Sequence, residues 1–465
     1  MTELPDNHVA LSALRALFGS ARALTAPEQL ELYASDDGPG RCPPRAVVFP
    51  RSHDEVAALV RIAHDARLPL VARGAGSGNV GGALPTPGSV VVSFECMQRI
   101  LEFDPADRLI RVEAGVITAE IDRLARGHGL FYPPDPGSAP YCRIGGNLAM
   151  NAAGPRALKY GGTRDYVLGL RAVGGDGRAL VSGCRTTKGV VGYDLTRLLV
   201  GSEGTLALIT EATLRLLPAP AAVGTLRVCY DGSAPACEAV QRVMAQPVIP
   251  CALEVMDTQA LAAVQRAGGA TDLPVATRAM LMVEADGEPA QVAGQLQALQ
   301  QVLRGPGLLE IKQALAAEEV ARLWRARRAL SGAVKALAPL KINEDIVVPV
   351  SRLAALTAGI EALARRHELP IVSFGHAGNG NLHVNIMVHP EAAGEMARAQ
   401  ACLRALFETV LELGGTLSGE HGIGAAKRAY VPLEIPADTL ALMRAIKREF
   451  DPRGILNPGK MFPDA

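Results

Sequence analysis

The first third of the chain alternates between the apolar spacing of amphipathic helices and that of short buried strands. The stretch from Ser52 to Pro69 predicts a helix that ends before the proline, because its apolar positions recur every three or four residues. Ser52 and Glu55, at the start of this helix, have the spacing of a capping box. One or two helices are also expected before residue 40. Short apolar runs predict three strands, at residues 69–73, 88–93 and 109–115.

After a glycine-rich stretch from residue 133 to about 163, the chain returns to strand-like spacing. Residues 167–183 predict a β-hairpin, and residues 205–218 predict a long strand or a pair of strands. A proline- and alanine-rich linker is expected at 218–222. From residue 223 to about 410, strands alternate with long helices, which is the pattern of an α+β fold.

The composition is that of a soluble globular protein, with 49% hydrophobic and 20% charged residues, and 465 residues suffice for two or three domains. The 47 basic and 47 acidic residues balance, so no nucleic acid or anionic membrane is expected as a partner. The first residues are acidic where a signal peptide would be basic, and no apolar run could span a bilayer. We therefore expect a cytoplasmic protein, with peripheral attachment to an inner membrane left open.

The eight cysteines are spread along the chain, and no two of them form a C-x-x-C pair. This spacing argues against an iron–sulfur cluster and against a zinc ribbon. A disulfide framework is not expected in so long a chain without a signal peptide. We expect reduced and mostly buried thiols.

A glycine-rich loop, GAGSGNVGG at residues 74–82, follows the first predicted strand. Residues 76–81 match G-x-G-x-x-G, but two prolines and a strand follow instead of the helix that a Rossmann motif requires. NAD is therefore not expected here. The glycines either form a plain turn or let backbone N–H groups approach a phosphate. Similar loops at residues 133–154 and 201–206 favour an extended anionic cofactor that lies along several backbone segments.

The order of the motifs along the chain resembles that of a known family. RGAGSGNVGG, PPDPGS, GGNLAMNAAG and GSEGTL, followed by GHAGNGNLHVN, GEHGIG and NPGK, are similar to motifs of the vanillyl-alcohol-oxidase/PCMH-type FAD enzymes. Within that family they most resemble the FAD-linked D-2-hydroxyacid dehydrogenases: D-lactate dehydrogenase, the FAD subunit of glycolate oxidase and D-2-hydroxyglutarate dehydrogenase. The resemblance covers about residues 40–463.

The resemblance implies an α+β fold with three parts: a PCMH-type FAD-binding domain, a ferredoxin-like α+β substrate domain, and a C-terminal helical segment that returns to the FAD domain. The expected division of the chain is an N-terminal helical segment at 1–40, the FAD-binding domain at 41–220, the substrate domain at 221–412 and the C-terminal segment at 413–465.

The resemblance also implies which residues contact FAD. Those at the pyrophosphate are Arg73, Gly74, Ala75, Gly76, Ser77, Gly78 and Asn79. Those at the flavin and its phosphates are Pro134, Gly137, Ser138, Gly145, Gly146, Asn147 and Asn151, with Asn457 from the C-terminal segment. Those at the adenine end are Gly201, Glu203, Gly204, Thr205 and Ile209. Because Ser77 stands near the place of the histidine that binds FAD covalently in some members, non-covalent FAD is expected; Cys142 leaves another attachment open.

Three of the nine histidines lie in two glycine-rich strings, GHAGNGNLHVN and GEHGIG. A strand, turn and strand over the first string would bring His376 and His383 to one side of a cavity, and Glu420 adds a carboxylate. Two imidazoles and a carboxylate with open positions are typical of a catalytic zinc or manganese site. The alternative is that the two histidines are structural and bond to neighbouring carbonyls. The resemblance implies the metal site, with His376, His383 and Glu420 as ligands.

The resemblance assigns three further residues. His421 matches the base that takes the proton of the substrate hydroxyl; the alternative is a histidine that orients Glu420. Arg327, on a predicted helix, matches the arginine that binds the substrate carboxylate, a task that suits a guanidinium. Asn385 matches a residue beside the metal.

These assignments imply oxidation of a D-2-hydroxy acid to the 2-oxo acid, with hydride transfer to flavin N5. Asn343 stands where the hydroxyglutarate enzymes have a lysine for the second carboxylate, and Lys341 lies two residues earlier. D-lactate or glycolate is therefore favoured. Without an NAD loop or cluster cysteines, the electrons need an external acceptor, such as a quinone, a cytochrome, an electron-transfer flavoprotein or an iron–sulfur subunit. A homodimer is left open.

Three other functions are open at this point. One is an FAD oxidoreductase of the same fold that acts on an alcohol or sugar acid without a metal. Another is a zinc hydrolase, which would leave the glycine-rich loops unexplained. The third is a non-catalytic subunit that binds FAD within a larger oxidase complex, and the residues at positions His421 and Arg327 argue against it.

Overall fold

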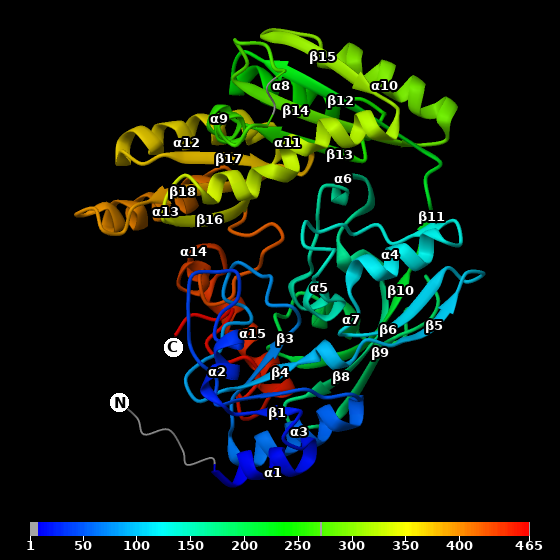
Figure 1. Ribbon diagram of the computed structural model, residues 1–465, viewed down its shortest axis with the longest axis vertical. Coiled ribbons are helices and arrows are strands. Elements are labelled where there is room, and N and C mark those ends of the chain that lie inside the picture. The colour runs from blue at the N-terminus through cyan, green and yellow to red at the C-terminus, as the bar shows by residue number, and fades with distance from the viewer. Residues whose placement is uncertain (1–7, 270–271, 465) are drawn as a thin grey trace. The chain divides into compact units, whose positions relative to one another are not determined.

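The computed structural model describes residues 8–269 and 272–464, which form two compact units (Figure 1). The first unit consists of the described residues of Met1–Gly154, Gly161–Ala219 and Glu420–Ala465. The second consists of Pro155–Tyr160 and the described residues of Pro220–Gly419. The second unit therefore includes a six-residue segment, Pro155–Tyr160, that lies in the sequence between two stretches of the first unit.

The first unit begins with a small sheet in the order β1-β2-β4-β3. Strands β2, β3 and β4 run parallel and are rich in valine, as expected of strands that are buried on both faces. Helices α1 and α3 share a hydrophobic core with these strands. The elements are α1 His8–Phe18, β1 Ala23–Leu24, α2 Pro27–Leu30, β2 Ala46–Val48, α3 His53–Ala66, β3 Leu70–Arg73 and β4 Val90–Ser93.

The start of α3 confirms one half of the predicted capping box. Ser52 Oγ accepts a hydrogen bond from Glu55 N at 3.2 Å. The Glu55 carboxylate, however, accepts from Arg51 N at 2.7 Å and pairs with Arg22 at 2.6 Å. The second hydrogen bond of the box is thus shifted from Ser52 N to Arg51 N, and an ion pair with a distant residue is added.

A second sheet of the first unit has the order β5-β6-β10-β8-β9 and is antiparallel throughout. Strands β8 and β9 form the predicted hairpin. A separate two-stranded pair joins β7 to β11. The elements are β5 Ile100–Asp104, β6 Leu109–Glu113, α4 Thr118–Arg126, β7 Leu130–Phe131, β8 Val167–Gly174, β9 Ala179–Gly183, α7 Leu195–Leu199, β10 Ala207–Arg215 and β11 Leu217–Pro218.

The glycine-rich loop after β3 reaches β4 without forming a helix, as its prolines predict. The geometry of a Rossmann dinucleotide site is therefore absent between these two strands. The later glycine-rich stretch does contain two short helices, α5 Ile144–Met150 in the first unit and α6 Ala157–Tyr160 in the second. Its sequence has no helical periodicity, so these helices were not predicted.

The C-terminal segment, with α14 Val431–Glu434 and α15 Ala437–Phe450, returns to the first sheet as the resemblance implies. Leu70 N donates to Ile455 O and Asn457 N donates to Leu70 O, each at 2.8 Å. Leu456 thus forms a parallel bridge with Leu70. The buried Asp451 carboxylate accepts from the amides of Ile455 and Leu456 at 3.1 and 2.8 Å, which fixes the turn before this bridge.

The second unit is built on a seven-stranded sheet in the order β15-β12-β14-β13-β17-β18-β16 (Figure 1). Its first half has the ferredoxin-like strand order 4-1-3-2 over β12, β13, β14 and β15, with helix α9 added between the second and third strands. The elements of this half are β12 Ala222–Tyr230, α8 Ser233–Met244, β13 Ala252–Met256, α9 Thr258–Arg266, β14 Ala279–Gly287, α10 Pro289–Leu303 and β15 Leu308–Ala314.

The remaining strands extend this sheet beyond β13. Helices α8, α10, α12 and α13 cover one face, and helices α9 and α11 cover the other. The core under α9 and α11 includes Met280, Met282 and Phe374. The added elements are α11 Ala317–Lys335, β16 Leu340–Val347, α12 Leu353–His367, β17 Ile371–Gly375, β18 Asn381–Val388 and α13 Glu395–Glu412.

Among the described helices, none combines the length and the apolar character that crossing a bilayer requires. All eight cysteines are free thiols, as expected from their spacing, and Cys142, Cys229, Cys237, Cys251 and Cys402 are buried.

The turn between β17 and β18 generates a prediction about Gly380. This residue has φ +74°, and an added Cβ would lie 1.8 Å from Val348 O. Gly394 has a similar φ of +76°, but an added Cβ would meet only Arg398 Nη1, at 4.0 Å. Both Gly→Ala changes cost roughly 1–2 kcal/mol in the left-handed conformation. We expect only Gly380→Ala also to displace backbone, and so to lower Tm several degrees further than Gly394→Ala. Equal Tm values in thermal unfolding would contradict this close approach.

Candidate functional site

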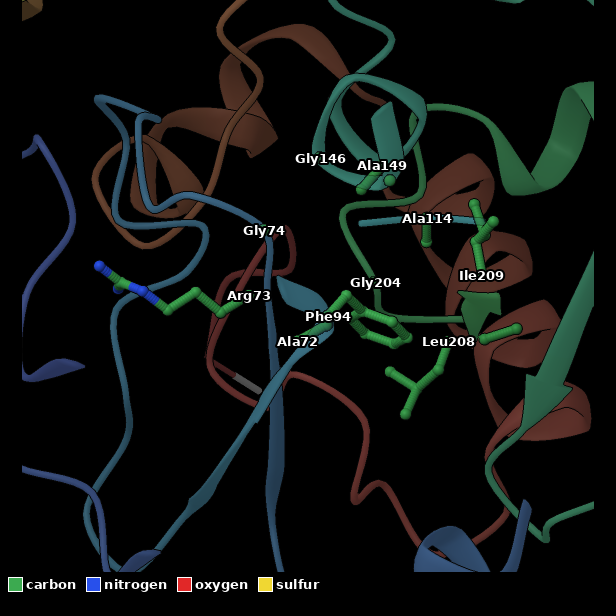
Figure 2. A pocket seen from close by; sticks show the side chains of 12 residues that line it. Ala72, Arg73, Gly74, Phe94, Ala114, Gly146, Ala149, Gly204, Leu208 and Ile209 are labelled. Atoms are coloured by element: carbon green, nitrogen blue, oxygen red, sulfur yellow. The ribbon is translucent and has the colours of Figure 1, made fainter. Parts of the chain in front are cut away.

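A pocket in the first unit brings backbone from separate loops together (Figure 2). Most of its lining residues are glycine or alanine, so backbone rather than side chains faces it. They are Ala72, Arg73, Gly74, Phe94, Ala114, Gly145, Gly146, Ala149, Gly204, Ala207, Leu208 and Ile209. Half of them lie where the resemblance implies FAD contacts: Arg73, Gly74, Gly145, Gly146, Gly204 and Ile209.

Two adjacent glycines of α5 serve this pocket in different ways. An added Cβ at Gly145 would lie 2.8 Å from Ala114 Cβ and 2.9 Å from Ala114 O, so the helix packs here on bare backbone. An added Cβ at Gly146 would have no atom within 4 Å. The missing side chain at Gly146 therefore leaves the pocket open, whereas the missing side chain at Gly145 allows close contact with Ala114.

The Arg73 side chain points away from the other labelled side chains of the pocket (Figure 2). Its Nη1 donates to Ser35 O at 2.7 Å, and its Cζ lies 5.6 Å from the centroid of the Tyr33 ring. Burial lowers the pKa of Arg73. The Arg73 guanidinium thus anchors the strand end to the N-terminal segment, and it is the backbone at this position that faces the pocket.

Several other predicted residues use their side chains on the protein itself. Asn147 Nδ2 donates to Thr118 Oγ1 at 2.8 Å, and Asn151 Oδ1 accepts from Arg164 N at 2.9 Å. Thr205 Oγ1 donates to Ser202 O at 2.6 Å. These bonds shape the loops around the pocket. The remaining implied FAD contacts, which do not line this pocket, stay predictions: Ala75, Gly76, Ser77, Gly78, Asn79, Pro134, Gly137, Ser138, Asn147, Asn151, Gly201, Glu203, Thr205 and Asn457.

Glu203 has a contact that its motif did not suggest. Its buried carboxylate accepts from Ile423 N and from Gly424 N, each at 2.7 Å. Burial raises the pKa of Glu203, although these two hydrogen bonds act in the opposite direction. Val80 O accepts from the amides of the next two residues, 425 and 426. The loop that carries His421 is therefore held from both sides within the first unit.

In the second unit, strand register decides which polar side chains meet. His383 on β18 lies opposite Asp345 on β16 and opposite Phe374 on β17. Because side chains alternate between faces, Asn385 shares the face of His383 and lies opposite Asn343. This is the face that α9 and α11 cover. Strand β18 therefore presents His383 and Asn385 on one surface of the sheet.

His376, just after β17, joins the same surface. Its ring centroid lies 5.2 Å from that of His383, with the two rings nearly perpendicular at 86°. The β13–β17 register places Glu254 beside His376, and His376 Nδ1 lies 2.5 Å from Glu254 Oε1. Arg327 Nε donates to the other oxygen of the same carboxylate at 2.7 Å. The Arg327 guanidinium also lies over the Phe374 ring, with Cζ 5.0 Å from its centroid.

Glu254 is an ionised carboxylate at zero exposure. Burial opposes its ionisation, but the charges and hydrogen bonds of His376 and Arg327 outweigh burial and lower the pKa of Glu254 to about 2. The two groups that the carboxylate contacts thus favour its ionised form. It holds two candidate functional side chains at once, one from the residue after β17 and one from α11.

Asp345 takes a similar position beside His383. Its Oδ1 lies 3.7 Å from His383 Nδ1 and accepts from Asn381 Nδ2 at 2.7 Å. Its Oδ2 accepts from Gly419 N at 2.9 Å. Asp345 thus links the turn before β18 to the segment that ends the second unit, and Glu420 is the next residue along the chain.

The histidines and carboxylates at this point could hold a metal ion. Within the second unit, the centroids of the His376 and His383 rings lie 5.2 Å apart, and Asp345 Oδ1 lies 3.7 Å from His383 Nδ1. Imidazole nitrogens and carboxylate oxygens are donors that suit zinc or manganese. These residues therefore fit part of a divalent metal site, and the full ligand set of His376, His383 and Glu420 stays a prediction.

The first unit carries His421, whose side chain is 19% exposed and whose Nε2 lies 4.0 Å from Glu420 Oε1. In the second unit, Asn385 Oδ1 is buried and has no hydrogen-bond partner among the described residues, while Asn385 Nδ2 donates to Val372 O at 3.1 Å. Lys341 lies on the same face of β16, one row beyond Asn343.

Two known family models match this chain. Residues 44–183 match the family model "FAD binding domain", and residues 219–461, more than half of the chain, match "FAD linked oxidases, C-terminal domain".

This chain belongs to the FAD-linked oxidase family.

Curated relatives of this FAD-linked oxidase are 2-hydroxyacid dehydrogenases and oxidases. The chain is 39% identical to the glycolate oxidase subunit GlcD of Bacillus subtilis, over 90% of this chain and 89% of the relative. It is 33% identical to a D-lactate dehydrogenase of Anaerostipes hadrus, over 91% and 90% of the two chains. It is 34% identical to the D-2-hydroxyglutarate dehydrogenase of Stutzerimonas stutzeri, over 97% and 98%. The FAD-linked oxidase is therefore an oxidoreductase of the family to which these enzymes belong.

A solved structure shows the same fold. The p-cresol methylhydroxylase structure aligns with a TM-score of 0.83 over 98% of this chain and 97% of the other, at 18% identity. The expected PCMH-type fold is therefore confirmed for the FAD-linked oxidase.

The pocket of the first unit fits the FAD that this family binds. Bare backbone at Gly74, Gly146 and Gly204 lets a large, extended molecule approach closely. Asn457 Oδ1 is buried without a hydrogen-bond partner among the described residues, while its Nδ2 donates to Glu203 O at 2.6 Å. This unsatisfied acceptor is consistent with a ligand that supplies the missing donor.

The structure also reveals polar residues that sequence reasoning missed. Glu254 and Asp345 are fully buried carboxylates beside the two candidate metal-binding histidines. The available signal was the presence of charged residues in two strand segments, one in ALEVM and two in NEDIVV. It could mark these carboxylates as paired, but it could not say with which partner.

The open space at Gly146 generates a prediction about FAD binding. We expect Gly146→Leu to fold with a Tm close to that of the wild type, because an added Cβ would have no protein atom within 4 Å and the rest of the side chain can extend into the pocket. The same side chain would fill the pocket, so the purified variant should contain little or no flavin. Gly294→Leu on α10 is the matched control, since Gly294 also has no atom within 4 Å of an added Cβ and does not line the pocket. The measurement is the ratio of flavin to protein absorbance, and a flavin-loaded Gly146→Leu protein would contradict the assignment.

Proposed function

We propose that this FAD-linked oxidase oxidises a D-2-hydroxy acid to the corresponding 2-oxo acid, using non-covalent FAD and a divalent metal. The observation that carries the proposal is the arrangement around Glu254. One buried carboxylate holds a guanidinium from α11 and an imidazole from β17 on the same face of the sheet. A site for a 2-hydroxy acid requires a cationic side chain that binds the carboxylate. It also requires a ligand for a metal ion that binds the neighbouring hydroxyl.

Each residue would have a defined task in the reaction. Arg327 would bind the substrate carboxylate through its Nη atoms, because its Nε is engaged by Glu254. His376, His383 and Glu420 would hold the cation, whose charge lowers the pKa of a bound hydroxyl. His421 would take the hydroxyl proton on its imidazole. FAD, when bound, would accept the hydride from the carbon atom that carries this hydroxyl.

The substrate class is supported by the relatives and by two residues of β16. Asn343, opposite Asn385, offers no charge for a second carboxylate, and Lys341 lies one row further from His383. We therefore favour a small monocarboxylate, D-lactate or glycolate, both of which match the names of relatives. The electrons would leave through an external acceptor. Membership of an oxidoreductase family argues against the zinc hydrolase that the sequence left open.

Metal removal tests the role of the histidine cluster. We expect a chelator to leave FAD bound but to abolish flavin reduction by the 2-hydroxy acid, and zinc or manganese to restore it. His383→Ala should lose both metal and reduction. His389→Ala is the control, because His389 directly follows β18 and its side chain is 53% exposed. Full reduction by metal-free protein would support instead a metal-independent oxidoreductase acting on an alcohol or sugar acid.

The planar guanidinium of Arg327 generates a second prediction. Arg327→Lys keeps the positive charge but loses the planar donor pair. We expect KM for the 2-hydroxy acid to rise about ten-fold or more, because hydrogen bonds to charged groups contribute roughly 1.5–3 kcal/mol. Arg328→Lys, at an exposed position of the same helix, should leave KM unchanged. Steady-state kinetics with an artificial electron acceptor measures both values, and equal KM values for the two variants would remove Arg327 from the site.

A further inference from the structure

Glu254 contacts two groups that the proposed reaction uses separately. Its Oε1 faces His376 Nδ1 at 2.5 Å and its Oε2 accepts from Arg327 Nε at 2.7 Å. His376 is 122 residues away in sequence and Arg327 is 73 residues away. The carboxylate lies on β13, between the strand that leads to the histidine and the helix that carries the arginine. No local motif links these three residues.

We propose that Glu254 is a positioning residue that sets the separation between the carboxylate-binding arginine and the metal-binding histidine. The inference rests on the proposed function. In a 2-hydroxy acid, the carboxylate and the hydroxyl are on adjacent carbon atoms, so the groups that bind them must be held at one fixed spacing. A single side chain with a bond to each of them sets that spacing directly.

The bond to His376 also determines which ring nitrogen can bind a metal. An ionised carboxylate only accepts hydrogen bonds, so Nδ1 of His376 carries the proton. The lone pair of the neutral ring is then on Nε2, which is the atom left to face a metal. Asp345 Oδ1 lies 3.7 Å from Nδ1 of His383, beyond hydrogen-bond distance, so both candidate ligands have a carboxylate on the Nδ1 side but only His376 bonds to it directly.

The bond from Arg327 to Glu254 also fixes the orientation of the guanidinium. With Nε on Glu254 and the plane over Phe374, the two terminal nitrogens make no hydrogen bond or ion pair with a described residue. They remain oriented donors for a carboxylate. A purely structural carboxylate would stabilise the contact between α11 and the sheet but would not need to leave these donors open.

The second unit contains a matched control for this distinction. Glu284 on β14 is also a buried carboxylate, and its Oε2 accepts from Trp324 Nε1 on the same helix α11 at 2.8 Å. Its other partners among the described residues are Thr225, whose Oγ1 lies at 3.1 Å, and Cys251. Glu284 thus ties α11 to the sheet, and none of these partners is His376 or Arg327.

The experiment compares Glu254→Gln with Glu284→Gln in FAD-loaded full-length protein. Zinc affinity is measured by competition with a chromophoric chelator, and Tm, KM and kcat are measured in parallel. Gln keeps the shape but offers one oxygen acceptor, so it cannot serve both partners. We expect Glu254→Gln to retain FAD, to bind zinc about 10–100-fold more weakly and to show a raised KM. Glu284→Gln should lower Tm but keep the zinc affinity and KM of the wild type.

Glu254→Asp provides a second variant if Glu254→Gln does not fold. It keeps the charge but withdraws the carboxylate by one methylene, and we expect an intermediate loss of zinc affinity. Zinc affinity and KM within two-fold of the wild type in either folded Glu254 variant would overturn the inference, as would equal losses in Glu284→Gln. A wild-type protein that holds FAD but binds no divalent metal would overturn the proposed metal mechanism itself, and the inference with it.

Discussion

The antiparallel register of β13, β17, β18 and β16 is the constraint that brings the polar residues Glu254, His376, His383 and Asp345 together. It sets Glu254 beside His376 and sets His383 between Phe374 and Asp345. A slip of one residue would turn each of these side chains to the opposite face. Close backbone contact resists such a slip, because a Cβ at Gly375 would lie 2.5 Å from Asn381 O. The register thus places ligands contributed by segments far apart in the sequence on one surface.

Burial gives these polar contacts their rigidity. A charged carboxylate at zero exposure is costly unless its oxygens are bonded, so Glu254 and Asp345 each need partners on both oxygens. The partners of Glu254, His376 and Arg327, are groups that the proposed reaction uses, whereas Asp345 accepts from Asn381 Nδ2 and Gly419 N. Glu203 follows the same rule in the first unit, where its two oxygens accept from the loop that carries His421. Side chains held in this way are oriented before a ligand arrives, which reduces the entropy lost on binding.

Local features of the fold could be predicted from the sequence, because they depend on neighbours along the chain. Examples are the helix after Ser52, the strands around the glycine-rich loop, and the absence of a helix in that loop. The surface shared by His376 and His383 also followed from a strand, turn and strand pattern. The pairing of Glu254 could not be predicted, because it depends on the contact of β13 with β17 across more than 100 residues. For the same reason, Glu203 had no visible partner in its motif.

We propose that this FAD-linked oxidase combines FAD with a site for D-2-hydroxy acids. The most direct measurement is the visible spectrum of the purified protein without oxygen, before and after addition of D-lactate, L-lactate, glycolate or D-2-hydroxyglutarate. We expect a yellow protein whose flavin absorbance is lost with D-lactate or glycolate and retained with L-lactate. A yellow protein that none of these acids reduces would contradict it, as would one reduced equally by both enantiomers of lactate.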